Sequence, residues 1–83
     1  MSAVTENADN YVLTCSMNGL ALRPYDDPNA NPIIASFPYG TLVHVGQVDW
    51  HTRMANITSH PQGWMRIDGA NGPLLSVNKT SCN

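Results

Sequence analysis

Aromatic rings and neighbouring carboxylates are the side chains of this sequence that could do chemistry. Asp26 and Asp27 are adjacent in a polar segment flanked by prolines, and Tyr25 precedes them. An aromatic ring offers a large flat contact area at a low entropy cost, and a carboxylate accepts hydrogen bonds from sugar hydroxyls, amides or an amine. The combination predicts a binding surface. Its candidate members are Tyr25, Asp26, Asp27, Tyr39, Trp50, His51 and Trp64.

Each aromatic candidate also has a structural interpretation. Trp64 follows Gly63 at the start of an apolar segment, so it could fill the interior of a small fold, and Tyr39 could cap a turn. Trp50 and Tyr25 lie in polar segments that offer no obvious buried partner, so we expect both at the surface.

Histidines are the residues best suited to acid–base or metal chemistry near neutral pH. His51 and His60 could face each other across a hairpin, but two histidines are an incomplete metal site. We expect these and His44 to be ordinary surface or half-buried side chains. The sequence contains no G-x-S-x-G element, no phosphate-binding loop and no H-E-x-x-H motif. We therefore expect no catalytic activity, no metal and no cofactor.

Length and charge narrow the possible partners. The chain has 83 residues, enough for one small domain, and 42% of them are hydrophobic, enough for a compact core. It has four Lys and Arg residues and a net charge of −2, so it lacks the clustered cations that nucleic acid and anionic membranes attract. No apolar run approaches the roughly 20 residues that span a bilayer.

The two cysteines, Cys15 and Cys82, predict a single disulfide and an oxidising compartment. The bond would close nearly the whole chain, and the chain-entropy relation assigns about 4–5 kcal/mol to so long a loop. Two unrelated buried thiols are the alternative. Residues 1–10 have neither the basic start nor the apolar stretch of a signal peptide. The protein is therefore either cytoplasmic or the mature part of a longer precursor, and the cysteines favour a secreted or extracytoplasmic location.

Short apolar segments separated by Gly, Pro and Asn clusters predict an all-β fold. Prolines are spread over the chain, and no segment shows sustained helical spacing of apolar residues. We expect residues 1–10 to form a flexible polar tail and residues 11–83 to form a single domain. The predicted strands are Tyr11–Cys15, Leu20–Arg23, Ile33–Phe37, Thr41–Val48, Gly63–Ile67 and Leu74–Val77.

Alternation along these strands predicts the core. Tyr11, Leu13 and Cys15 are expected on one side of the first strand, with Cys15 facing inward, which argues against a nucleophilic role for its thiol. The expected core residues are Leu13, Leu20, Leu22, Ile34, Phe37, Val43, Val45, Met65, Ile67, Leu75 and Val77.

Turn residues predict how the strands connect. Pro38 and Gly40 suit the second and fourth positions of a type I turn. The segment 68–72 contains Asp-Gly and Asn-Gly, which predicts an antiparallel hairpin between 63–67 and 74–77.

Two connecting segments, 24–32 and 49–62, are longer than the fold needs. Long loops in compact domains are often functional. The second segment could also continue a hairpin that turns near 55–59.

Four apolar elements occur in a fixed order within residues 11–78. They are Leu20-Ala21-Leu22-Arg23, the segment Ile33–Phe37, Gly40 with Val43 and Val45, and Gly63-Trp64 with Ile67. In this order and at this spacing, the chain resembles a bacterial-type SH3 (SH3b) domain. The resemblance implies a small, partly open SH3-like barrel of five to six short antiparallel strands.

The chain departs from the usual SH3b pattern at three places, one of which is the segment 49–62, longer here than is usual. Pro24-Tyr25-Asp26-Asp27 stands where small residues usually follow the arginine. Gly72-Pro73 stands where a second Gly-Trp is usual, so one expected surface aromatic is missing.

Domains of this class usually bind and do not catalyse. The resemblance therefore implies a non-catalytic module that attaches a protein to a cell-wall polymer, either peptidoglycan (stem peptide or glycan) or a chitin-like glycan. Its surface is expected at the 24–32 and 49–62 loops, with Trp64 at the edge. The alternative is a small secreted effector or inhibitor that binds a partner protein. A third possibility is a stand-alone subunit that dimerises through an edge strand.

Overall fold

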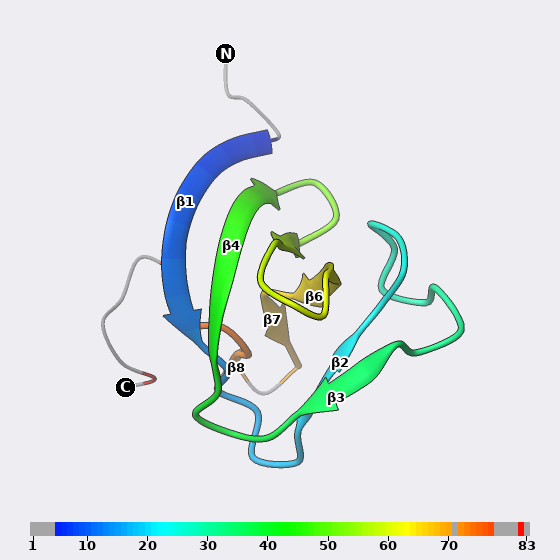
Figure 1. Cartoon of the computed structure of the whole chain (residues 1–83), viewed down its shortest axis with the longest axis vertical. Coiled ribbons are helices and arrows are strands. Elements are labelled where there is room, and N and C mark those ends of the chain that lie inside the picture. The colour runs from blue at the N-terminus through cyan, green and yellow to red at the C-terminus, as the bar shows by residue number, and fades with distance from the viewer. Residues whose placement is uncertain (1–4, 71, 78–81, 83) are drawn as a thin grey trace.

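The computed structural model describes residues 5–70, 72–77 and 82. These residues form strands and turns and no helix, which confirms the all-β class (Figure 1). None of the described segments is therefore a helix long and apolar enough to cross a membrane. The strands are β1 (Thr5–Leu13), β2 (Leu20–Leu22), β3 (Ala35–Phe37), β4 (Leu42–Asp49), β5 (Met54–Ile57), β6 (Gly63–Arg66), β7 (Asp68–Gly69) and β8 (Gly72–Pro73).

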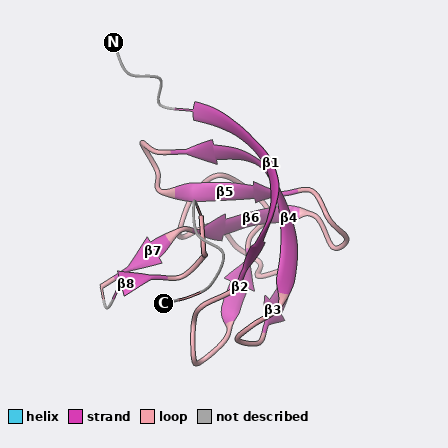
Figure 2. Cartoon of the chain, turned by 90° about the vertical axis from the view of Figure 1, so that its left-hand side faces the viewer, coloured by secondary structure: helices cyan, strands magenta, loops and turns pink. Residues whose placement is uncertain are grey.

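All strand pairs are antiparallel. The largest sheet has four strands in the order β1-β4-β5-β6, and β2–β3 and β7–β8 form two-stranded ribbons (Figure 2). An isolated bridge joins Arg23, directly after β2, to Trp64 on β6, with N–H···O distances of 2.7 and 2.8 Å in the two directions. A second bridge joins Thr14 to Leu75. These bridges connect the ribbons to the large sheet around one core and leave the architecture partly open.

The N-terminal strand is longer than predicted. Residues 5–10 were expected in a flexible tail, but they continue β1, and Thr5 pairs with Asp49 and Glu6 with Val48 on β4. The expectation is wrong here because pairing with a neighbouring strand, which no local pattern encodes, orders a polar segment. Residues 1–4 lie outside the described residues.

The side-chain orientation predicted for β1 is also wrong. Val12 and Thr14 are buried, whereas Tyr11 is 63% exposed and Leu13 and Cys15 are half-buried. Both faces of this segment carry apolar residues, so alternation alone does not choose between them. Thr14 tolerates burial because its hydroxyl donates to the carbonyl of Pro38 at 2.7 Å.

The core contains most of the predicted residues and several that were missed. Ile34 is 47% exposed, so its predicted burial is wrong, and Phe37 and Val77 are half-buried at the edge of the core. The buried core cluster comprises Val12, Leu20, Leu22, Val43, Val45, Val48, Ala55, Ile57, Met65, Ile67 and Leu75.

Segment 49–62 contains a strand, which the sequence analysis treated mainly as a loop. β4 and β5 form a hairpin that turns at residues 50–53 and not near 55–59. Burial of Ala55 and Ile57 against the core accounts for this strand. The functional loop expected at 49–62 is therefore reduced to this tight turn and the connection that follows β5.

The predicted hairpin between 63–67 and 74–77 does not form. β6 pairs instead with β5, and Asp68 and Gly69 pair with Pro73 and Gly72 in a small ribbon of their own. The Asp-Gly and Asn-Gly signals therefore locate a real reversal, but they do not extend it into β6.

The turn before β4 lies one residue later than expected. Thr41 N–H donates to the carbonyl of Pro38 at 3.3 Å, so Pro38 occupies the first position of the turn. Gly40 has a φ of 83°, a conformation that favours glycine. Because the third position of this turn requires a positive φ, Gly40 occupies it, and the turn therefore begins at Pro38.

The predicted disulfide between Cys15 and Cys82 is present, with a Cα–Cα distance of 5.5 Å. It links the end of the first strand region to the C-terminal region across 67 positions of sequence. Such a bond is typical of oxidising compartments.

Candidate functional site

The 24–32 loop and the 50–53 turn meet, as the binding hypothesis requires. The hydroxyl of Thr52 donates to Oδ1 of Asp26 at 2.5 Å. Oδ1 of Asp49 accepts hydrogen bonds from the backbone N–H groups of His51 at 2.9 Å and Thr52 at 3.4 Å, which shapes the turn. We call the surface formed by residues 24–32 and 49–53 the loop face.

The carboxyl groups of Asp26 and Asp49 interact directly. Burial raises the pKa of Asp26, and its hydrogen bond with Asp49 and the negative charges of Asp49 and Asp27 raise it further, against the opposing effect of Thr52. The hydrogen bond from Asp26 lowers the pKa of Asp49, as do the backbone N–H groups of the turn. The two carboxyl groups therefore titrate as a coupled pair, in which Asp26 holds its proton more tightly than Asp49.

Hydrogen bonds within the 24–32 loop give it a defined shape. Oδ1 of Asp27 accepts from the N–H of Asn29 at 2.9 Å, and Nη1 of Arg23 donates to the carbonyl of Ala30 at 3.0 Å. Asp27 itself is exposed, and Tyr25 is 67% exposed. The loop thus presents an aromatic ring and a carboxylate to solvent, as predicted.

Two buried apolar side chains, Ala30 and Met54, lie outside the main core cluster. Ala30 belongs to the loop, and Met54 directly follows the turn to which the loop is hydrogen-bonded. On β5, Met54 alternates with Ala55, which faces the core, so Met54 faces the other side of the sheet. Ala30 is therefore buried within the loop face, and Met54 is buried directly after its turn, both apart from the main core cluster.

Trp50 and His51 lie in the turn of the loop face but differ in exposure. His51 is exposed, whereas Trp50 is half-buried and packs against the main core. The guanidinium carbon of Arg53 lies 5.0 Å from the centroid of the Trp50 ring, and the arginine also pairs with Asp68. The ring of Trp50 therefore contacts the core and Arg53, neither of which its sequence neighbours indicate, and these contacts leave less of the ring free for a ligand.

Trp64 lies at the edge of the loop face, whereas Tyr39 lies far from it. Trp64 is half-buried on β6 and pairs with Arg23 at the base of the 24–32 loop, so it lies at the edge of the loop face. Tyr39 is in the turn before β4, while Trp50 follows the end of β4. The eight residues of β4 span roughly 25 Å, so Tyr39 does not belong to the same site.

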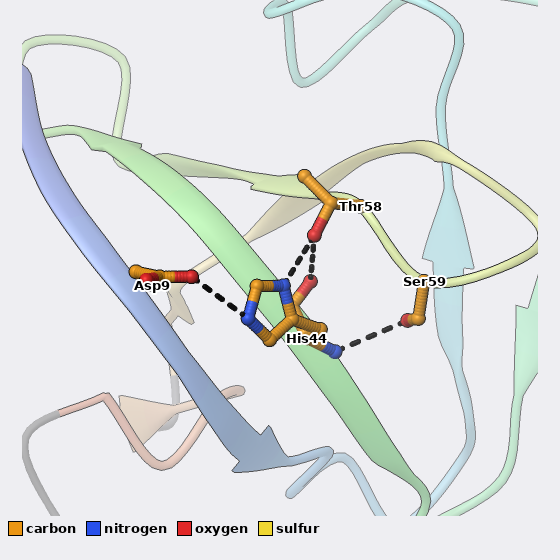
Figure 3. Close-up of polar contacts among 4 residues, drawn as sticks. All are labelled: Asp9, His44, Thr58 and Ser59. Carbon is orange, nitrogen blue, oxygen red and sulfur yellow. Dashed lines mark hydrogen bonds and ion pairs between the residues drawn. The ribbon is translucent and has the colours of Figure 1, made fainter.

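A second constellation, which the sequence analysis missed, links three strand regions. Nε2 of His44 on β4 lies 3.1 Å from Oδ1 of Asp9 on β1, and Nδ1 of the same ring contacts the hydroxyl of Thr58, directly after β5 (Figure 3). Ser59 Oγ accepts from the His44 N–H at 3.1 Å. The ring of Tyr11 meets the imidazole edge-on, with centroids 4.8 Å apart.

The order carboxylate, imidazole, hydroxyl is also that of nucleophilic triads. Here the hydroxyl of Thr58 lies 3.4 Å from the backbone carbonyl of His44, and the backbone N–H of Thr58 donates to the same carbonyl at 2.9 Å. The hydroxyl is thus held within the strand pairing, and both ring nitrogens of His44 have partners within the chain. These contacts therefore hold Asp9, His44 and Thr58 in fixed orientations relative to one another.

The remaining histidine hypotheses concern metal binding. His51 precedes β5 and His60 follows it, so the two residues lie at opposite ends of this strand and do not face each other. Within the part of the chain that the structure describes, no group of three or more His, Cys, Asp or Glu side chains could hold a metal ion.

A cavity of about 250 Å³ lies next to the disulfide. It is lined by Cys15, Ser16, Met17, Asn18, Gly72, Pro73 and Leu74. None of the predicted binding residues contributes to it.

Comparisons with known proteins give no relative from which a function could be transferred. No family model matches the chain, and neither a curated protein nor a solved structure matches it.

Proposed function

We propose that the protein is a non-catalytic binding module that attaches to a cell-wall polymer through the loop face. The observation that carries this proposal is the contact between Thr52 and Asp26, which joins two segments far apart in sequence directly after the exposed Tyr25. The resemblance to SH3b domains supports the class of ligand.

The charge of the loop face favours a ligand that carries an amine. Asp26, Asp27 and Asp49 lie close together there, and the nearby cation Arg53 is already paired with Asp68. An ammonium group gains from this negative potential, and a peptide plane or sugar ring can stack on Tyr25. Peptidoglycan offers both chemistries, because its stem peptides carry amines and its glycan carries sugar rings. The surface is small, so we expect a Kd in the range of about 1 μM or weaker.

A secreted or extracytoplasmic location belongs to the same proposal. The Cys15–Cys82 disulfide supports it, because such bonds persist mainly outside the reducing cytosol.

A second candidate function is binding to a partner protein, as a small secreted effector or inhibitor. The observation that favours it is the group of exposed apolar side chains in and next to the 24–32 loop, Tyr25, Ile33 and Ile34. Clustered exposed apolar residues are typical of protein interfaces.

Retention of the oxidised protein on insoluble peptidoglycan and on chitin tests the leading proposal. We expect retention on one of these polymers, and we expect Tyr25→Ala or Asp27→Asn to reduce it at least fivefold. Tyr39→Ala is the matched control, because this tyrosine is also exposed but lies at the other end of β4. The proposal fails if neither polymer retains the protein, or if all three variants bind like the original. Capture of a protein from an extracellular extract that depends on Tyr25 and Ile34 would then support the second candidate.

A further inference from the structure

We propose that the outer face of the four-stranded sheet carries a second binding site, which takes an uncharged saccharide. We call this surface the bulge face and define it by Asp9, Tyr11, His44, Asn56 and Thr58. It goes beyond the proposed function, because no residue of the loop face belongs to it.

Two irregularities in strand pairing meet at the centre of this surface. Between β1 and β4, the pairs Asn7–Gln47 and Asn10–Val45 leave Ala8 and Asp9 opposite Gly46. A bulge of this kind bends the strand and changes the direction of its side chains. Asp9 has a φ of 46°, and its carboxylate reaches the ring of His44.

A second bulge lies on the other side of Gly46. Between β4 and β5, the pairs Val45–Ile57 and Val48–Ala55 leave Gly46 and Gln47 opposite Asn56. The pairing of β4 with both of its neighbours, β1 and β5, is therefore irregular at Gly46. Bulges concentrate at sheet edges and next to functional sites, where they aim a side chain at a ligand or a partner.

The glycine at the centre is required by close packing. A Cβ added to Gly46 would lie 2.8 Å from Cγ2 of Thr58 and 3.5 Å from Oδ1 of Asn56. The absence of a Cβ at Gly46 thus makes room for the methyl group of Thr58, which packs against the backbone of β4 beside Asn56. This packing fixes the position of Thr58, the partner of the His44 ring, at the centre of the surface.

The exposed groups around Gly46 match the chemistry of a sugar. The carboxylate of Asp9 and the amide oxygen of Asn56 can accept hydrogen bonds from neighbouring hydroxyl groups. Both ring nitrogens of His44 are already engaged with Asp9 and Thr58. The amide nitrogen of Asn56 donates to the carbonyl of Gly63 at 3.2 Å. The Asp9 side chain is 89% exposed, so most of its acceptor capacity faces solvent. The imidazole of His44 contacts both Asp9 and the ring of Tyr11 and so holds these two groups in place, which lowers the entropy cost of binding.

An exposed apolar strip next to the polar groups suits the C–H face of sugar rings. Tyr11 is 63% exposed and its ring is oriented by the edge contact with His44. Leu42, 60% exposed, pairs with Leu13 on the same face and extends the strip along the sheet. The length of the strip favours an oligosaccharide over a single sugar.

The charge of the bulge face disfavours anionic ligands. The five residues of the bulge face include one carboxylate and no Lys or Arg, so phosphate-bearing and other anionic ligands are disfavoured. The loop face, in contrast, concentrates three carboxylates and suits a cation. The two surfaces therefore recognise different chemistry.

Titration of the isotope-labelled protein with N-acetylchitotetraose, and with maltotetraose as a second neutral oligosaccharide, tests the proposal by NMR. We expect the amide signals of Tyr11, His44 and Asn56 to shift with one of these probes. We expect Tyr11→Ser and Asp9→Asn to raise the Kd at least tenfold. The matched controls Tyr39→Ser and Asp27→Asn should bind like the original protein.

The proposal is overturned if neither saccharide shifts these signals at about 10 mM, a concentration well above a typical weak Kd. It is also overturned if the shifts map to Tyr25 and Asp27, because the saccharide then uses the loop face. Signal dispersion in each variant spectrum confirms folding. Polymer retention that depends on Tyr25 and not on Tyr11 would support the proposed function of the loop face even if the bulge face binds no saccharide. Failure of one proposal is therefore distinguishable from failure of the other.

Discussion

The loop face and the bulge face are built in different ways. The loop face depends on side-chain contacts between two segments, above all those of Asp26 with Thr52 and Asp49. The bulge face lies on paired strands, and its side chains are aimed by irregularities in the backbone pairing itself. A surface held by titrating side chains responds to pH, whereas a surface fixed by strand pairing keeps its shape until the sheet unfolds. Changes that affect one surface and not the other test this difference.

Removal of the disulfide should have the largest effect and should act on both faces. Cys15 and Cys82 close a loop of 67 positions, for which chain entropy gives about 4–5 kcal/mol. We expect the double variant Cys15→Ser/Cys82→Ser to lose several kcal/mol of unfolding free energy, measured by urea denaturation. A loss below about 1 kcal/mol would show that the covalent link is not a main source of stability.

Met54→Ala should destabilise the loop face before the sheet. Met54 is fully buried outside the main core, and truncation of such a side chain costs about 2–4 kcal/mol. Hydrogen exchange should accelerate first in residues 24–32. Met65→Ala is the matched control, because Met65 is equally buried but belongs to the main core. Equal exchange patterns in the two variants would contradict a separate support for the loop face.

Gly46→Ala should damage the bulge face and leave the loop face intact. The added Cβ meets Thr58 at 2.8 Å, and overpacking of this kind costs about 1–3 kcal/mol. We expect altered His44 and Thr58 signals, loss of saccharide binding and unchanged polymer retention. At Gly40 an added Cβ meets no atom within 4 Å, so Gly40→Ala strains only a positive φ and should leave these signals unchanged. Loss of polymer retention in Gly46→Ala would contradict the independence of the two faces.

The smallest effect concerns pH. Because the pKa of Asp26 is raised on folding, its contribution to stability is complete below its ordinary pKa of 3.8 and is lost as the pH rises through the raised value. The pKa of Asp49 is lowered, so its contribution is present above 3.8 and is lost as the pH falls through the lowered value. Taken together, the raised pKa of Asp26 and the lowered pKa of Asp49 predict that this pair stabilises the loop face most in mildly acidic solution. The other charged groups that act on this pair are Asp27, on Asp26, and His51, on Asp49.

Asp26→Asn tests this pH dependence, because an amide keeps a donor toward Asp49 and does not ionise. Between about pH 4 and pH 7, the melting temperature of the original protein should fall relative to that of the variant. Glu6→Gln, which changes an exposed carboxylate on β1, is the control and should preserve the original slope over this range. Parallel curves for the original protein and Asp26→Asn would show that the carboxyl pair does not couple folding to pH.

Local patterns predicted the class of fold and part of the core. Alternation identified Leu20, Leu22, Val43 and Val45 as buried, and two cysteines in a short chain identified the disulfide. These inferences succeed because each depends on side-chain spacing or composition, which a single sequence displays. The contact between the 24–32 loop and the turn after β4 brings together segments named in the prediction, although it involves Asp49 and Thr52, which were not predicted, and leaves out Tyr39.

The bulge face could not be predicted in the same way. Asp9, His44 and Thr58 come from three strand regions, and their proximity depends on two register shifts that no local pattern encodes. The polar residues before Tyr11 have the composition of a tail, and only their pairing with β4 makes them a strand. Likewise, polar neighbours of Met54 and Ile57 concealed β5, whose burial appears only when the core is assembled.

The covalent link between Cys15 and Cys82 makes most of the chain a closed ring. A protease that cuts one exposed loop inside this ring opens it but releases no fragment, because both products stay joined through the sulfurs. The strands on either side of the cut also stay paired. Outside the cell, where proteases are abundant, the molecule would therefore tolerate a first cleavage, and the cleavage would become visible as separate fragments only after reduction.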